Sequence, residues 1–332
     1  MANIKDVARR AGVSVATVSH VINGTRHTRP ETEERVRAAI RELGYSQNLA
    51  ARNLAVGRSS ILGLIISDIR NPFFPEITAS FQDQSLLHDM EAVVLNTNYD
   101  THRTLNCVKR LLGLQVPGVA ILTSQIDPSV IQLLASKNVA AVYLDLGRVD
   151  RCISNILIDY EHGVAQALDH LSALGHQRVG FVGGPPHLHS AQRRKAAFLE
   201  RASACGMNVV GAIDSDFSVK GGYFACSKLL SASGPTAIVA GNDLTAIGSV
   251  HCAYDRGIKV PGDLSVVGFD DITFAEYTQP ALTTVAVPRE EIGRVAFQAL
   301  QDIMSDPDLA GKEYRVETHL VARQSTSQAS SH

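Results

Sequence analysis

The 332-residue sequence lacks the features of a membrane-spanning or disulfide-bonded protein. Its five cysteines are odd in number, widely scattered and without a CxxC pair, so we expect reduced thiols rather than disulfides. No run of about 18 apolar residues could span a membrane, and residues 1–6 contain no apolar signal core. These absences predict a cytoplasmic protein with no membrane partner.

The sequence also lacks the short motifs of common enzyme classes. GxxxxGK[ST], GxGxxG after a strand, GxSxG and HExxH do not occur. The segment 214–216 has no later Gly and Glu of a calcium loop, and His187 with His189 is too weak a pair for a metal site. We therefore predict no enzymatic activity, no cofactor and no bound metal.

Charge is unevenly distributed along the chain, although the net charge is only −2. Residues 1–60 carry +5 and the remainder carries −7. A small basic segment joined to a larger acidic one is typical of a nucleic-acid-binding head on a body with a separate role.

The head, residues 1–45, has the pattern of a helix-turn-helix, with helices expected at Ile4–Ala11, Val15–Asn23 and 31–43. Asn3 with Asp6 has the spacing of a capping box, Gly12 breaks the first helix, and Ser14 caps the second. The start of the second helix would then lie in the major groove of DNA.

The outward side chains of that second helix are the candidate DNA contacts. Val15 and Ala16 can touch a thymine methyl group, and His20 can hydrogen-bond a purine edge. Thr17 and Ser19 suit phosphate contacts, although a solvated helix face explains any single Ser or Thr equally well.

A short helix-forming joint, residues 46–59, links the head to the body. Asn48 is a good N-cap, and the helix formers 49–56 end at Gly57. Because an isolated helix needs roughly 12–15 residues to persist in water, this one should form only when something holds it. The joint therefore has the properties of a switch.

The body, residues 60–326, alternates strands and helices, which predicts a doubly wound parallel α/β fold in two lobes. Strands are expected at 61–67, 92–96, 118–122, 141–144, 178–182, 237–240 and 265–268. Helices are expected at 76–88, 103–114, 163–174, 190–205, 221–230 and 244–255. Ligands of such folds gather at the C-terminal ends of the strands.

Several polar and aromatic residues follow these strands and could hold a small polar ring. Phe73 and Phe74 come after the first strand, where two aromatics also fit simple core packing. Carboxylate, amide and guanidinium groups follow later strands or open helices: Asp145, Arg194, Asn242 and Asp270. Each of these alone also fits a helix cap or a solvated loop, and we expect Asp243 to be such a cap.

These residues together resemble the LacI/GalR family of bacterial transcription regulators, and the head most resembles that of its purine repressors. The resemblance rests on IKDVARRAGVS (4–14), ATVS (16–19), Asn23, PET (30–32), LGY (43–45) and ARQST (322–326). It implies a dimeric, ligand-responsive repressor that binds a palindromic double-stranded DNA operator. An activator or a global catabolite regulator of the same family is the alternative.

The resemblance assigns DNA contacts to Asn3, Val15, Ala16, Ser19, His20, Asn23, Tyr45, Asn48, Ala51 and Leu54, and Ser14 and Thr17 at the start of the second helix are further candidates. Leu54 would wedge between base pairs from the minor groove, whereas its sequence context alone favours packing on the body. Two departures from the family pattern are Gln47, where proline is frequent, and Arg29, where Ser or Thr usually caps the third helix.

The resemblance assigns effector binding to Asn71, Phe73, Phe74, Asp145, Arg194, Phe217, Asn242 and Asp270. Phe73 and Phe74 would form a stacking wall, and Phe217 would close over the other face of the ligand. Leu146 stands where purine repressors carry tryptophan, which favours a sugar or sugar-like polyol over a purine.

The predicted lobes are 60–160 plus 290–320 and 161–289 plus 321–326, followed by a disordered tail, 327–332. The tail has no leucine heptads, so we expect a homodimer rather than a tetramer. A sugar-binding protein without regulatory output would need an export signal, and an enzyme with a DNA-binding head would need a catalytic base. Neither feature is found in the sequence.

Overall fold

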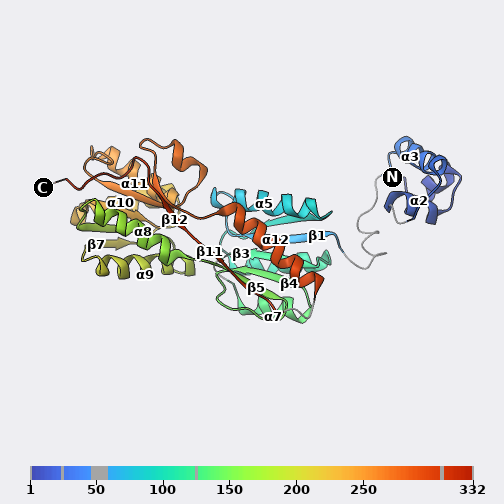
Figure 1. Cartoon of the computed structure of the whole chain (residues 1–332), viewed down its shortest axis with the longest axis horizontal. Coiled ribbons are helices and arrows are strands. Elements are labelled where there is room, and N and C mark those ends of the chain that lie inside the picture. The colour runs from blue at the N-terminus through green and yellow to red at the C-terminus, as the bar shows by residue number, and fades with distance from the viewer. Residues whose placement is uncertain (1, 24–25, 46–58, 124–125, 307–309, 331–332) are drawn as a thin grey trace. The chain divides into compact units, whose positions relative to one another are not determined.

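The computed structural model describes residues 2–23, 26–45, 59–123, 126–306 and 310–330. The chain separates into two compact units, Met1–Ser59 and Ser60–His332 (Figure 1). Most of the predicted joint, 46–58, lies outside the described residues, and with it Gln47, Asn48, Ala51 and Leu54.

The first unit contains the predicted helix-turn-helix, formed by α1 (Ile4–Ala11), α2 (Val15–Asn23) and α3 (Pro30–Leu43). The capping box is present: Asn3 Oδ1 accepts from the Asp6 amide at 3.2 Å, and Asp6 Oδ2 accepts from the Asn3 amide at 3.0 Å. A small core holds the three helices together: Val7, Ala8, Ala11, Val18, Val21, Val36 and Ala39. Arg29 makes no side-chain cap at α3.

The second unit contains two six-stranded, mostly parallel sheets, which confirms the predicted α/β fold. The first sheet has the order β11 (Glu313–Val316), β5 (Ile153–Ile158), β4 (Ala140–Leu144), β3 (Gly118–Leu122), β1 (Ile61–Ile66) and β2 (Glu91–Asn96). The second has the order β12 (His319–Val321), β10 (Thr283–Ala286), β9 (Ser265–Asp270), β8 (Ala237–Ala240), β6 (Arg178–Val182) and β7 (Asn208–Ile213).

Helices cover the sheets of each lobe (Figure 1). The first lobe has α5 (Phe73–Leu87), α6 (Thr101–Gly113), α7 (Pro128–Ser136) and α12 (Arg289–Ser305). The second has α8 (Tyr160–Ala173), α9 (His189–Ala204), α10 (Val219–Ser233), α11 (Asp243–Asp255) and the 3₁₀ helix η1 (Thr273–Tyr277). The sequence prediction lacks the following elements: β5, β7, β10, β11, β12, α7, α12 and η1. β7 is an edge strand of half-buried residues, so it shows no continuous apolar run.

The chain crosses between the two sheets three times, at Asp159, at 287–288 and at 317–318. The first and third crossings are joined, because the Asp159 amide donates to the Val316 carbonyl at 3.0 Å and Thr318 Oγ1 donates to the Asp159 carbonyl at 2.7 Å. Strand β12 pairs antiparallel with β10. Residues 319–320 therefore belong to the second lobe, whereas the sequence prediction placed them in the first.

The C-terminal segment packs against the second lobe over 325–330. Ser325 Oγ donates to the Val266 carbonyl, Ser327 Oγ donates to the Pro261 carbonyl, and the Ala329 amide donates to the Leu174 carbonyl. The predicted disorder is therefore wrong for 327–330, because serine hydroxyls replace an apolar anchor there. Residues 331–332 lie outside the described part of the chain.

No helix in the described ranges is long and apolar enough to cross a membrane. All five cysteines lie in the described ranges as thiols outside any disulfide, and all except Cys205 are buried. Within those same ranges, no group of three or more His, Cys, Asp or Glu side chains is arranged to hold a metal ion.

Candidate functional site

The candidate DNA-reading surface is the first turn of α2. Ser14, Val15 and Ala16 are exposed there, and the bulky apolar side chain of Val15 is 40% exposed. Ser14 Oγ accepts from the Thr17 amide at 3.1 Å, so it caps the helix that carries these residues. Such a turn can present apolar atoms to the edges of bases.

Four of the remaining predicted DNA contacts in the head are less exposed than these three residues. Thr17, Ser19 and His20 are half-buried, and Tyr45 packs against the core of the head. Asn23 ends α2. Asn3 uses its side-chain oxygen to cap α1. The DNA roles of these residues remain predictions.

The candidate effector site is a cavity between the two lobes, where the C-terminal ends of strands from both sheets meet. It has an empty volume of about 430 Å³, open solvent included. All eight predicted effector residues line it: Asn71, Phe73, Phe74, Asp145, Arg194, Phe217, Asn242 and Asp270. Six further residues complete the lining: Ser67, Tyr99, Leu122, Leu144, Tyr160 and Ser190.

The charged centre of the cavity is the pair Arg194, from α9, and Asp270, at the end of β9. Their side chains are 7% and 4% exposed, and Nη2 lies 3.2 Å from Oδ1. Arg194 also donates to the Gly241 carbonyl. Arg194 Nε has no hydrogen-bond partner among the described residues, and Asp270 Oδ1 is engaged there by the Arg194 ion pair. A buried donor is therefore left beside a buried carboxylate.

Aromatic rings surround this charged pair. The Arg194 guanidinium carbon lies 4.2 Å from the ring centroid of Phe269, 4.7 Å from Tyr160 and 5.7 Å from Phe217. Burial raises the pKa of Asp270 to about 6, although the cations of Arg194 and Arg289 act in the opposite direction. The rings hold the guanidinium in place by stacking and exclude water from the pair.

Asp145, at the end of β4, already has partners within the protein. Tyr160 donates to its Oδ2 at 2.6 Å, and the Ile158 amide donates to its Oδ1 at 3.1 Å. Arg193 of the second lobe reaches the same Oδ1 at 3.4 Å. Burial raises the pKa of Asp145, and the hydrogen bond from Tyr160 partly offsets this effect. Tyr160 is therefore an important site residue, which the sequence prediction missed because it did not contain β5.

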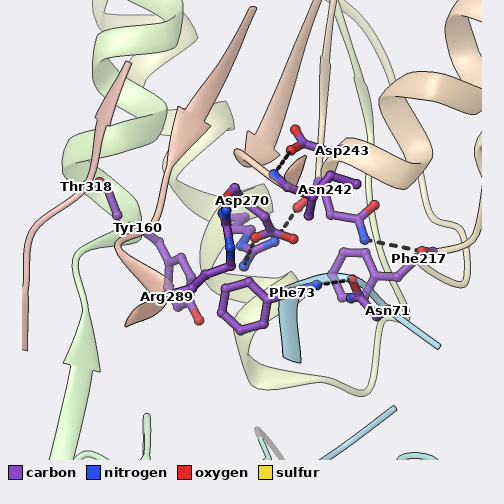
Figure 2. A network of polar contacts seen from close by, with 12 residues as sticks. Asn71, Phe73, Tyr160, Phe217, Asn242, Asp243, Asp270, Arg289 and Thr318 are labelled. Carbon is purple, nitrogen blue, oxygen red and sulfur yellow. Dashed lines mark hydrogen bonds and ion pairs between the residues drawn. The ribbon is translucent and has the colours of Figure 1, made fainter. Parts of the chain in front are cut away.

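Asn242 and Phe217 form the opposite wall (Figure 2). Asn242 Oδ1 accepts from the Thr245 amide at 2.9 Å, and its Nδ2 donates to the Phe217 carbonyl at 3.2 Å. Phe217 has a positive φ of 62°, a strained conformation for a bulky residue. The Phe217 ring packs directly on Gly184, where it leaves no room for a Cβ.

Asp243 differs from its predicted role as a helix cap. Asn242 is the N-cap of α11, and Asp243 is its buried first residue. The Asp243 carboxylate accepts from the Ile272 amide at 2.8 Å and from the Thr284 hydroxyl at 2.5 Å. It therefore anchors the loop that follows Asp270, and burial raises its pKa well above the ordinary value.

The first-lobe wall is built at the start of α5. Asn71 Oδ1 accepts from the Phe73 amide at 3.1 Å, which fixes the turn into the helix. Phe73 and Phe74 lie edge to face with ring centroids 5.2 Å apart. Both rings line the cavity and also belong to the hydrophobic core, so the core-packing and ligand-wall interpretations are compatible.

Known proteins resemble this chain over both units. Residues 3–48 match the family "Bacterial regulatory proteins, lacI family", and residues 168–326 match a "Periplasmic binding protein-like domain". The HTH-type transcriptional repressor PurR of Proteus mirabilis is 33% identical over 98% of this chain and 97% of its own length.

Solved structures agree with these sequence matches. A lac repressor dimer bound to operator and the anti-inducer ONPF superposes with a TM-score of 0.87 at 28% identity, covering 98% of this chain and 99% of its own. A complex of the transcriptional regulator CelR with cellobiose gives a TM-score of 0.74 at 29% identity, covering 98% and 100%. Full-length similarity to such repressors, joined to the helix-turn-helix and the two-lobed body described above, shows that the chain belongs to the lacI family of ligand-responsive bacterial transcription regulators.

Proposed function

We propose that this regulator represses transcription by binding a palindromic operator as a homodimer, and that a sugar or sugar-like polyol in the cavity controls this binding. The observation that carries the proposal is the buried Arg194–Asp270 pair, whose two residues line a cavity with aromatic walls. A DNA-binding function also implies that the protein acts in the cytoplasm.

The donor and acceptor of this pair match the chemistry of a sugar. A hydroxyl group can accept from the Arg194 guanidinium and donate to the Asp270 carboxylate at the same time. The rings of Phe73 and Phe217 offer apolar faces for the C–H groups of the sugar ring. Leu146 adds no aromatic plane for a flat base, so a polyol is the better match.

Control of DNA binding by the ligand is expected because the residues that line the cavity come from both lobes. Phe73 and Phe74 belong to the first lobe, whereas Arg194 and Asp270 belong to the second. A ligand that touches both sets binds one arrangement of the lobes better than any other. Its effect on DNA binding is then a coupling free energy of typically about 1–3 kcal/mol. The two known structures support this proposal, since one holds operator and ONPF and the other cellobiose.

A thermal-shift screen with neutral mono- and disaccharides, polyols and purine bases tests the ligand class. A binding sugar at 100 times its Kd should add about 2.7 kcal/mol to stability. Arg194→Gln should weaken its binding by at least roughly tenfold, because it removes a charge-assisted donor. Arg201→Gln, at an exposed position of the same helix, is the matched control. Stabilisation by purine bases but by no sugar or polyol would contradict the proposed ligand class.

A further inference from the structure

Arg289 begins α12 directly after the second crossing between the lobes. Its side chain is only 10% exposed, yet it is absent from the cavity lining. It lies beside Asp270 (Figure 2). The location suggests a role that does not involve touching the ligand.

The Arg289 guanidinium group contacts both lobes. In the first lobe, Nε donates to Glu76 Oε2 of α5 at 2.8 Å, and Nη2 lies 2.8 Å from the same oxygen. In the second lobe, Nη1 donates to the carbonyl of Asp270. Thr273 of the second lobe completes the link by donating to Glu76 Oε1 at 2.7 Å. We call Glu76, Thr273, Arg289 and the Asp270 carbonyl the interlobe clasp.

The clasp holds two segments that line the cavity from opposite sides. Glu76 lies one turn after Phe73 on α5, so the helix fixes its position relative to the aromatic wall. Asp270 has φ of 110° and Asp271 has φ of 54°, both in the region that non-glycine residues rarely adopt. The direction of the Asp270 carboxylate therefore depends on contacts that keep this turn in place, and Arg289 supplies one at the carbonyl.

We propose that Arg289 is a positioning residue that sets the distance between the lobes and, through the Asp270 turn, the direction of the ligand-binding carboxylate. The planar guanidinium is suited to this task because it bonds a carboxylate and a carbonyl from fixed directions. The proposal goes beyond the ligand class, since it holds for any molecule that the cavity binds.

The test measures the interlobe distance in the full-length protein without ligand or DNA. Spin labels are attached at Lys137→Cys in the first lobe and Glu200→Cys in the second, with the half-buried Cys205 changed to Ser. Pulsed electron-electron resonance then gives the distance distribution. Arg289→Gln should shift it to longer, broader distances, and Arg289→Lys should lie between this variant and the wild type.

Thr273→Ala keeps the proposal falsifiable if Arg289→Gln does not fold. It removes one interlobe hydrogen bond without burying an unpaired charge, and a smaller shift in the same direction is expected. Arg201→Gln breaks an exposed ion pair within the second lobe and should leave the distribution unchanged. Wild-type distance distributions for both Arg289→Gln and Thr273→Ala would overturn the proposal. The measurement uses no sugar, so this outcome would leave the proposed function untouched.

Discussion

At the scale of single residues, Asp270 is a buried carboxylate that lines the cavity. Its pKa is about 6 in the folded chain, where burial favours the neutral form, and about 3.9 in an unfolded chain. The folded state therefore binds this proton more tightly than the unfolded state does. The resulting stabilisation is complete below about pH 4 and is lost as the pH rises through about 6.

Asp270→Asn should remove this pH dependence, because the amide stays neutral throughout. Relative to Asp270→Asn, the wild type should lose free energy of unfolding between pH 4.5 and pH 7, as measured by urea unfolding at a series of pH values. Parallel wild-type and Asp270→Asn curves would show that Asp270 does not titrate in this range.

At the scale of single elements, α1 depends on its capping box. Asn3→Ala removes the acceptor of the Lys5 and Asp6 amides and should destabilise the head by about 1 kcal/mol. Hydrogen exchange of the full-length protein should show faster exchange of α1 amides and unchanged exchange in α8. Asn3→Asp should retain protection, since Asp caps equally well. Equal protection in all three proteins would contradict a stabilising role for the cap.

The joint at 46–59 carries the other element-scale prediction. Leu54→Ala should weaken specific operator binding roughly 10- to 100-fold, because an alanine cannot wedge between base pairs. Binding to nonspecific DNA should change little, since it rests on phosphate contacts, and both must be compared at one salt concentration. Electrophoretic mobility shifts with a palindromic and a scrambled duplex measure the two. Unchanged operator affinity would show that Leu54 does not contact the operator as predicted.

Elements with strong local signals were predictable from the sequence. The helices of the head and the buried central strands β1, β3 and β8 have caps or continuous apolar runs. The residues that line the cavity could be predicted from the rule that ligands lie at the C-terminal ends of strands, together with the family resemblance.

Features that depend on pairing between distant segments were not predictable. Tyr160 contacts Asp145 only because a crossing between the lobes brings the two together. Arg289 and Glu76 are 213 positions apart in sequence, and neither shows a local sign of its partner. The order of 327–330 rests on hydrogen bonds from serines, which composition alone assigns to a disordered tail.

At the scale of the whole molecule, the second lobe exposes aromatic side chains on α10, α11 and η1. Phe224 is 54% exposed, Tyr254 79%, Phe274 59% and Tyr277 74%. Exposed aromatic residues of this kind are enriched at protein interfaces. We therefore expect the proposed homodimer to bury part of this surface, which matches the need of a palindromic operator for two heads.

Tyr277→Asp should shift the protein from dimer to monomer. A twofold interface contains each substituted residue twice, so a loss of about 2 kcal/mol per tyrosine weakens dimerisation by roughly 1,000-fold. Sedimentation over a concentration series measures the dissociation constant, with Leu199→Asp on the exposed side of α9 as the control. Operator affinity should fall in Tyr277→Asp while hydrogen-exchange protection of the head stays unchanged, because the substitution lies in the other unit. If Tyr277→Asp remains a dimer that binds operator normally, the aromatic surface around η1 is not the dimer interface.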